Sequence, residues 1–206
     1  MTAAAEIRCR REKREFFDRL AADWRRENRL TAADRELILS TLSPGELDRS
    51  GPILDLGGGA GRLAGFFREL GVRLPLLIDI SARMLKEVAS LPIPRLQGDA
   101  HRLPLRAGSV GLVYCFSAFP HFEGKEEVIR ECGRILRPGG LLVILHGCGR
   151  EEINRFHSAQ SAVIAGDHLP PLEYFRRWGE QAGMIPERLE DGRKRFLVRY
   201  RKPLSR

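Results

Sequence analysis

A glycine-rich turn between a predicted strand and a predicted helix constrains the fold of this 206-residue chain more than any other segment. The run Ile-Leu-Asp-Leu-Gly-Gly-Gly-Ala-Gly spans residues 53–61, and a predicted helix follows over residues 62–70. Gly57, Gly59 and Gly61 form a G-x-G-x-G pattern. Glycine lacks a Cβ, so the backbone can turn sharply and a ligand can lie against it. The first amides of the following helix can face that ligand. The run therefore predicts a cofactor-binding turn in an α/β fold.

Two common nucleotide-binding motifs do not match this turn. A dinucleotide fingerprint requires G-x-G-x-x-G, and Arg62 stands where the third glycine would fall when counted from Gly57. A phosphate-binding P-loop requires Gly-Lys followed by Ser or Thr, which this turn lacks. The pattern D-x-G-x-G-x-G, from Asp55 to Gly61, resembles motif I of class I S-adenosylmethionine-dependent methyltransferases. The resemblance implies that Asp55 and the glycines hold the methionine part of the cofactor.

A second apolar run, over residues 74–80, also ends in an acid. Asp79 lies 18 residues after Gly61, near the position at which doubly wound folds place a ribose-binding carboxylate. A carboxylate can accept hydrogen bonds from two ribose hydroxyls at once. Ser81 is the expected N-cap of a helix over residues 82–90. We predict that Asp79 holds the ribose; the alternative is a solvated acid at a strand end.

Two further segments extend the resemblance. Gly98-Asp99-Ala100 resembles the third motif of the family, which implies that Asp99 accepts from the adenine amino group and that the Ala100 amide faces the ring. A simple turn at Gly98-Asp99 is the alternative. Residues 109–122 resemble the fourth strand and its loop, with Gly111 and Pro120 as departures from the usual pattern. The resemblance also assigns Gly58, Ile80 and Phe116 to the cofactor-binding residues.

The resemblance runs from about residue 51 to 145 and implies a complete fold. Residues 137–140 match the turn before a fifth strand over 141–145, and Asp191-Gly192 predicts a hairpin turn between two terminal strands. We expect an α/β, Rossmann-like, seven-stranded and mostly parallel sheet, its last strand antiparallel, with helices on both faces and an N-terminal helical lid. The expected division of this single domain is a helical cap over 1–50, a cofactor-binding core over 51–147, and an acceptor-side segment with the hairpin over 148–206.

The lid is predicted from two helical segments. Phe16, Phe17, Leu20 and Trp24 recur at helical spacing within residues 6–29. A second helix over residues 31–42 begins with Thr31 as N-cap and is stopped by Pro44-Gly45. The aromatic stripe either faces the cofactor cleft or packs as ordinary core, and Trp24 is the residue that we expect to face the substrate cavity.

Composition limits the location and the partners. The hydrophobic content of 43% is typical of a globular protein. No apolar run approaches the ~18 residues of a membrane-spanning helix, and the charged N-terminal segment is unlike a signal peptide. We therefore expect a cytoplasmic protein that does not insert into membranes. The four cysteines show no C-x-x-C spacing, and reduced thiols are the default in that compartment.

The net charge of +8 does not by itself predict a nucleic-acid partner. Acidic residues are interleaved with the basic ones, as in the run over residues 8–15. Such a run is typical of a solvated helix face with i,i+4 ion pairs. We expect a small-molecule methyl acceptor and no nucleic acid; the sequence gives no indication of the oligomeric state.

Three histidines are the candidates for the acceptor side. His121 lies just beyond the predicted fourth strand and could act as a general base or pack under the lid. His146 ends the predicted fifth strand, where ligands bind in open α/β sheets, and His157 follows in a predicted helix. Cys148, Asn154 and His168 accompany them as polar residues of the same segment. Pocket lining, capping or surface roles are open for this group, and His146, His157 and a thiol could also bind a metal.

The sequence as a whole is similar to small-molecule methyltransferases of the ubiquinone and menaquinone type. Enzymes that methylate amino groups of nucleic-acid bases usually carry Asn/Asp-Pro-Pro-Tyr/Phe after the fourth strand. This chain lacks that motif there, so it does not resemble them. We therefore predict a methyltransferase that uses S-adenosylmethionine and yields S-adenosylhomocysteine by direct displacement at a small-molecule acceptor. An RNA or protein methyltransferase with a basic binding surface, and a non-catalytic cofactor-binding subunit, are the alternatives.

Overall fold

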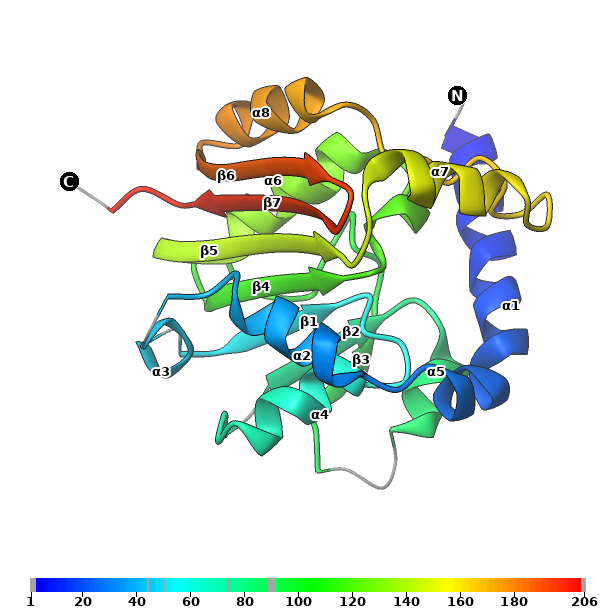
Figure 1. Ribbon diagram of the computed structural model, residues 1–206, viewed down its shortest axis with the longest axis horizontal. Helices are drawn as coiled ribbons and strands as arrows, with labels where there is room; N and C mark the ends of the chain where they lie inside the picture. The colour runs from blue at the N-terminus through cyan, green and yellow to red at the C-terminus, as the bar shows by residue number, and fades with distance from the viewer. Residues whose placement is uncertain (1–2, 44, 50, 74, 89–91, 205–206) are drawn as a thin grey trace.

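Helices cover both faces of a central sheet in a computed structural model that describes residues 3–43, 45–49, 51–73, 75–88 and 92–204 (Figure 1). The sheet has seven strands in the order β3-β2-β1-β4-β5-β7-β6. The pairs from β3 to β5 are parallel, and β7 is antiparallel to both β5 and β6. The predicted fold class is confirmed. The strands are β1 (Ile53–Leu56), β2 (Pro75–Asp79), β3 (Arg95–Gln97), β4 (Val110–Phe116), β5 (Leu136–His146), β6 (Ile185–Gly192) and β7 (Arg195–Arg201).

The helices form two layers and a lid. One layer holds α2 (Ala32–Leu39), α4 (Arg62–Glu69) and α5 (Ala82–Glu87), and the other holds α6 (Lys125–Ile135) and α8 (Leu172–Gln181). Outside these layers lie α1 (Ala3–Glu27), α3 (Glu46–Arg49), α7 (Arg150–Ser158) and the 3₁₀ turn η1 (Phe119–His121). None of the described helices has the length and apolar character needed to cross a lipid bilayer.

The central strands are buried on both faces because helices pack against each side. All four residues of β1 and all seven of β4 are buried, as expected for continuous apolar runs between helix layers. Phe67 of α4 packs edge-to-face on Tyr114 of β4, while Val128 and Cys132 of α6 are fully buried in the core on the opposite side. The rigid sheet therefore fixes where each strand ends.

The position of the site follows from the strand order. The chain adds strands outward from β1 in one direction through β2 to β3, and in the other direction through β4 to β5. Ligands of open α/β sheets bind outside the carboxyl ends of the strands where this direction reverses. Figure 1 shows α1 standing beside that edge, toward which the arrowheads of β4 and β5 point. The lid and the expected cofactor cleft are thus neighbours.

Several local predictions need correction. The turn at residues 137–140 is an irregularity inside β5 and does not precede it; Gly139 has a positive φ of 77° and donates its N–H to the carbonyl of Lys202, which holds the irregularity in the strand. The hairpin turn is formed by residues 193–194 instead of Asp191-Gly192, since Gly192 still pairs with Arg195 and the Asp191 carboxylate accepts from Arg150.

Other boundaries agree with the sequence to within a few residues. Thr31 caps α2 through a reciprocal capping box with Asp34, as predicted for an N-cap. The short helix α3 was not expected from the sequence. Predictions that involve Pro44, Leu74 and Ser90 lie outside the described residues.

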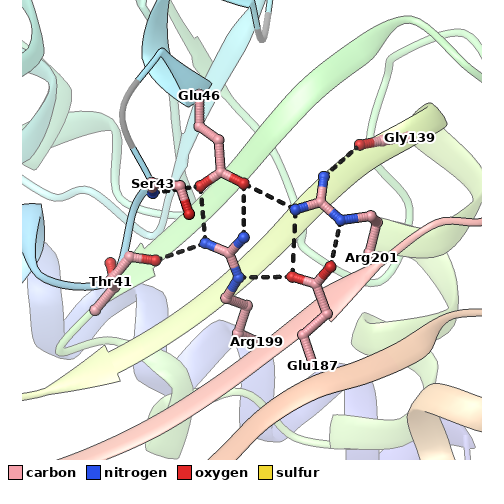
Figure 2. A network of polar contacts seen from close by, with 7 residues as sticks. All are labelled: Thr41, Ser43, Glu46, Gly139, Glu187, Arg199 and Arg201. Carbon is pink, nitrogen blue, oxygen red and sulfur yellow. Dashed lines mark hydrogen bonds and ion pairs between the residues drawn. The ribbon is translucent and has the colours of Figure 1, made fainter.

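A network of charged side chains joins the terminal hairpin to the segment after α2 (Figure 2). Glu46 accepts from both Nη atoms of Arg199, at 2.9 and 2.6 Å, and from Arg201 at 2.8 Å. Glu187 of β6 accepts from the same two arginines, and Arg199 also donates to the carbonyl of Thr41. Burial alone would raise the pKa of Glu46, but hydrogen bonds from Arg199, the Ser43 amide and Arg201 outweigh it and lower this pKa to about 2.

We expect Glu46→Gln to lower the free energy of unfolding at neutral pH by roughly 1.5–3 kcal/mol, because charge-assisted hydrogen bonds to Arg199 and Arg201 are lost. The folded pKa of Glu46 lies below its ordinary 4.5, so its contribution is present above that value and fades as the pH falls toward 2. Denaturant titrations should therefore show the difference between variant and wild type shrinking in acid. Exposed Glu36→Gln on α2 is the control, and an equal effect in both variants would contradict the network's role.

Candidate functional site

A hollow of about 970 Å³, counting the part open to solvent, lies at the carboxyl edge of the sheet. Nine of the ten residues predicted to bind the cofactor line it: Asp55, Gly57, Gly58, Gly59, Asp79, Ile80, Asp99, Ala100 and Phe116. The tenth, Gly61, lies behind the turn as the N-cap of α4, where an added Cβ would meet Val88 at 2.9 Å. Arg10, Lys13, Phe17 and Trp24 of α1 line the opposite wall. Trp24 thus lines the hollow, and its expected position facing a substrate stays a prediction.

The glycine turn owes its shape to close packing as well as to backbone freedom. An added Cβ at Gly58 would lie 2.3 Å from a methyl carbon of Leu77 and 2.4 Å from the Asp55 carboxyl group, so no other residue fits. Gly59 has a φ of 54°, which L-residues rarely adopt, and an added Cβ there would have no atom nearer than 3.7 Å. The Gly59 turn therefore lies within van der Waals distance of Met84 and Trp24, in the lining of the hollow.

Asp55 joins this turn to the following helix. The residue is 1% exposed, and its carboxyl group accepts a hydrogen bond from the Ala64 amide at 2.9 Å. Burial raises the pKa of Asp55 to about 7, against the lowering effect of the Ala64 amide and of Arg62. The residue therefore organises the start of α4 while also lining the hollow.

Asp79 links the glycine turn to the end of β2. One carboxylate oxygen accepts from the Gly59 amide and the other from the Ser81 amide, both at 2.8 Å. Burial raises the pKa of Asp79 even though these two hydrogen bonds favour the charged form. Each carboxylate oxygen has a second acceptor position. The carboxylate can therefore hold the turn and still accept from a ligand hydroxyl.

Asp99 is already engaged by protein groups. It accepts from the backbone amide of His101 at 3.0 Å, contacts the His101 ring at 2.5 Å, and forms an ion pair with Arg10 of the lid at 3.0 Å. Burial alone would raise the pKa of Asp99, but His101 and Arg10 hold it well below the ordinary value. His101 also contacts the carbonyl of Glu123 at 2.5 Å. Sequence reasoning missed His101 and Arg10, because the link between lid and strand end is formed only in three dimensions.

Arg62 and Ser117 are two further residues of the hollow that sequence reasoning did not single out. The Arg62 guanidinium stacks over the Phe116 ring at 4.9 Å and makes no hydrogen bond or ion pair with any other described residue. Burial lowers the pKa of Arg62, while Asp34 and Asp55 oppose that shift. Ser117 has a φ of 56°, the only positive value among the described non-glycine residues. Such backbone strain is concentrated at functional sites.

The structure brings His121 and His157 together and places His146 near them. The rings of His121 and His157 are 4.8 Å apart, and His121 also packs against Phe17 of the lid at 5.0 Å. Of the three histidines, only His121 lines the hollow. Its Nδ1 lies 2.7 Å from the carboxylate of Asp167, a buried residue of the loop between α7 and α8. Sequence reasoning did not single out Asp167.

His146 and His157 are held as neutral buried groups. Burial, then the charges of His121, His157 and Arg62, lower the pKa of His146 to about 3. Burial and His121 lower the pKa of His157 to about 4. Each ring has one buried nitrogen without a hydrogen-bond partner among the described residues. They are therefore uncharged polar groups next to the hollow.

The remaining polar candidates mainly shape the loop that carries Asp167. Asn154 of α7 makes two hydrogen bonds to the backbone of Leu169, and the exposed His168 contacts Ser158 at 2.9 Å. Cys148 is partly buried, and all four cysteines are free. Within the described ranges, no group of three or more His, Cys, Asp or Glu is arranged to hold a metal ion.

This fold and site define a Rossmann-like α/β protein with a ligand cleft at the switch point of its sheet. A model of the methyltransferase domain matches residues 54–144. The malonyl-[acyl-carrier protein] O-methyltransferase of Methylovorus sp. (strain MP688) is 31% identical, over 85% of this chain and 70% of the relative. The chain belongs to the class I S-adenosylmethionine-dependent methyltransferase family, whose cofactor is S-adenosylmethionine.

A further relative and a solved structure of the same fold carry names that give other methylated compounds. The dimethylglycine N-methyltransferase of Parasynechococcus marenigrum (strain WH8102) is 28% identical over 82% of this chain and 64% of the relative. A crystal structure from Thermotoga maritima, described as a possible histamine N-methyltransferase, has a TM-score of 0.70 at 18% identity and covers 91% of this chain and 99% of that one. The chain spans about half the length of several other curated relatives that it matches.

We expect Asp79→Ala to weaken S-adenosylhomocysteine binding roughly 10- to 100-fold, because a charged acceptor contributes about 1.5–3 kcal/mol per hydrogen bond. The melting temperature should also fall, since the amides of Gly59 and Ser81 lose their partner. Isothermal titration calorimetry and thermal unfolding measure the two effects. Asp23→Ala on the exposed face of α1 is the control; an unchanged dissociation constant in Asp79→Ala would exclude a ligand contact.

Proposed function

We propose that the protein transfers a methyl group from S-adenosylmethionine to a small-molecule acceptor bound beneath α1. The observation that carries this proposal is that the cofactor-binding candidates and the residues of α1 line opposite walls of one hollow. The glycine turn and the strand-end acids form one wall, and Lys13, Phe17 and Trp24 of the lid form the other with His121 beside them. Methyl transfer requires alignment of acceptor, methyl group and sulfur, and one enclosed hollow favours that alignment.

The residues of the first wall fit the parts of the cofactor. Asp79 would accept from the ribose hydroxyls, and Asp99 with Ala100 would face the adenine. Arg62 offers a guanidinium without a hydrogen-bonded partner among the described residues, which suits the carboxylate of the methionine part. When bound, the cofactor supplies a methyl group on a positively charged sulfur.

A small acceptor is supported by how tightly the lid is fastened. Arg10 is paired with Asp99, and Lys13 reaches Glu123 and Asp167, so α1 is joined to three core segments. The names of the relatives give both nitrogen and oxygen as methylated atoms, so the acceptor atom stays a proposal for this chain. The cytoplasmic location expected from the sequence likewise stays a prediction.

The positive charge of the chain gives little support to an RNA acceptor. Many arginines are paired with acids, among them Arg10, Arg35, Arg134, Arg150, Arg195, Arg199 and Arg201. An RNA substrate would require a surface of cations available for phosphates and a steep salt dependence of binding.

Trp24 offers a direct test of cofactor binding under the lid. It lines the hollow, whereas the second tryptophan, Trp178, packs on Phe175 of α8 away from it. We expect S-adenosylhomocysteine to change the tryptophan fluorescence of the wild type and of Trp178→Phe, and to leave that of Trp24→Phe nearly unchanged. Calorimetry on the same three proteins measures the dissociation constant independently.

Transfer itself is tested with labelled S-adenosylmethionine and a panel of small hydroxyl, amine and carboxyl compounds, with a transfer RNA pool as the polymer control. Label in a small molecule supports the proposal. Binding of the cofactor without transfer to any acceptor would favour the non-catalytic alternative, and label in RNA alone would contradict the small-molecule assignment.

A further inference from the structure

Two lysines, one from α1 and one from α6, donate hydrogen bonds to the backbone carbonyls around His121. The ammonium group of Lys125, at the start of α6, donates to the carbonyls of Pro120 and Phe122, both at 2.9 Å. Lys13 of the lid donates to the carbonyl of His121 itself at 2.9 Å. Buried lysines are usually paired, and here the two ammonium groups together donate to the carbonyls of three consecutive residues, Pro120, His121 and Phe122. The position of the His121 ring is therefore fixed from its backbone outward.

The ring is held from a third direction by Asp167, which is in turn held by the lid. One oxygen of the Asp167 carboxylate contacts His121 Nδ1 at 2.7 Å, and the other contacts Lys13 Nζ at 2.5 Å. Lys13 also contacts Glu123 at 2.5 Å. Burial alone would raise the pKa of Asp167, but His121 and Lys13 outweigh it and keep the pKa below the ordinary value. Asp167 is thus an ionised acceptor for His121.

This arrangement sets the proton position on the His121 ring. An ionised carboxylate can only accept, so in the neutral imidazole Nδ1 carries the hydrogen and Nε2 carries the lone pair. Since Asp167 takes Nδ1, Nε2 is the nitrogen left for the hollow that His121 lines. A base whose second nitrogen is fixed by a carboxylate is the arrangement that activates nucleophiles in many enzymes. Lys13 is a further part of this arrangement, because Asp167 contacts both His121 and Lys13 only when α1 lies over the hollow.

The surrounding charges select the kind of acceptor. The Asp167 carboxylate, which contacts His121, and the Glu123 carboxylate are both paired with Lys13, so neither is left to bind a protonated amine. Asp79, whose charge also acts on His121, accepts from the amides of Gly59 and Ser81. His146 and His157 are neutral. A neutral acceptor fits this environment, because the ammonium group of Lys13 is already paired with both carboxylates. The rings of Phe17, Trp24 and Phe122 line the same hollow and favour a flat molecule.

We propose that His121 is a general base positioned by Asp167 and by the lid residue Lys13, and that the acceptor is a neutral molecule with a phenolic or enolic hydroxyl. This inference rests on the proposed function. The acceptor O–H bond breaks and its proton passes to His121 Nε2. The oxygen electron pair forms the bond to the methyl carbon, and the carbon–sulfur bond breaks with its pair left on sulfur, which becomes a neutral thioether. The imidazolium, stabilised by Asp167, then releases its proton to water.

Nuclear magnetic resonance of ¹⁵N-labelled histidine tests the positioning without cofactor or turnover. The signals of His121 are identified by their loss in His121→Gln, and we expect them to report hydrogen on Nδ1. In Asp167→Asn, the ammonium group of Lys13 can still only donate hydrogen bonds. The amide oxygen should therefore face Lys13, and the amide NH₂ group should face His121. The hydrogen should then move to Nε2. An unchanged tautomer in Asp167→Asn, or hydrogen on Nε2 in the wild type, would overturn the positioning role.

The acceptor class is tested with two probes of the same shape, 4-nitrophenol and 4-nitroaniline, on protein saturated with S-adenosylhomocysteine. At about pH 6, near the range in which histidine titrates, we expect bound 4-nitrophenol to show a larger phenolate absorbance than the free compound. The charged and titratable groups around His121 are Asp167, Lys13 with its partner Glu123, His146, His157 and, at longer range, Asp79. His121→Gln should abolish the excess, and 4-nitroaniline should bind more weakly.

Turnover gives the last comparison. With labelled S-adenosylmethionine and 4-nitrophenol, His121→Gln should slow methyl transfer by about 10²- to 10⁴-fold while the dissociation constant of S-adenosylhomocysteine stays within about two-fold. Exposed Glu173→Gln on α8 is the control. Equal phenolate signal in wild type and His121→Gln, preference for 4-nitroaniline, or no binding of 4-nitrophenol would each overturn the inference. Loss of S-adenosylhomocysteine binding in the wild type would instead contradict the proposed function.

Discussion

The buried ammonium group of Lys13 is the interaction on which the arrangement of the site depends. Its side chain is only 5% exposed, and two carboxylates and a carbonyl from the core surround it. Burial alone would lower the pKa of Lys13, but Asp167 and Glu123 raise it above the ordinary value, so the group stays charged. A buried charge left without its partners costs several kcal/mol. Helix α1 is therefore fixed over the hollow by a requirement of charge as much as by its apolar stripe.

The sheet and the cofactor wall could be predicted from the sequence because their signals are local. Asp55 lies near the end of β1, Asp79 is the last residue of β2, and Asp99 follows β3. Parallel strands end at one edge, so sequence order alone brings these acids together. Gly58 adds a steric reason that the sequence pattern contains but does not explain, since its neighbour is Leu77 from the next strand. Strand boundaries near Gly139 and Gly192 were less accurate, because pairing with β7 extends both strands through residues typical of turns.

The acceptor side was predicted less well because its contacts join distant segments. Lys13 and Asp167 are 154 residues apart, and no spacing rule connects a lysine in a charged helix to an acid in a loop. His121 drew attention only through its place after the fourth strand. His146 and His157 were predicted as a group with His121, and the structure places all three near one another while leaving only His121 at the hollow. Which of them acts on an acceptor stays a prediction.

The insertion of β7 between β5 and β6 has a consequence for folding. In the described sheet β6 pairs with β7 alone, so β6 can join the sheet only together with β7 or after it. Leu141 meets Arg201 in the pairing of β5 with β7, and contacts so distant in sequence form late and slowly. Until then, the Leu-, Val- and Ile-rich strand β5 has one unpaired edge, which can pair with another chain. The newly made protein is thus most prone to aggregation while its last strand is still undocked.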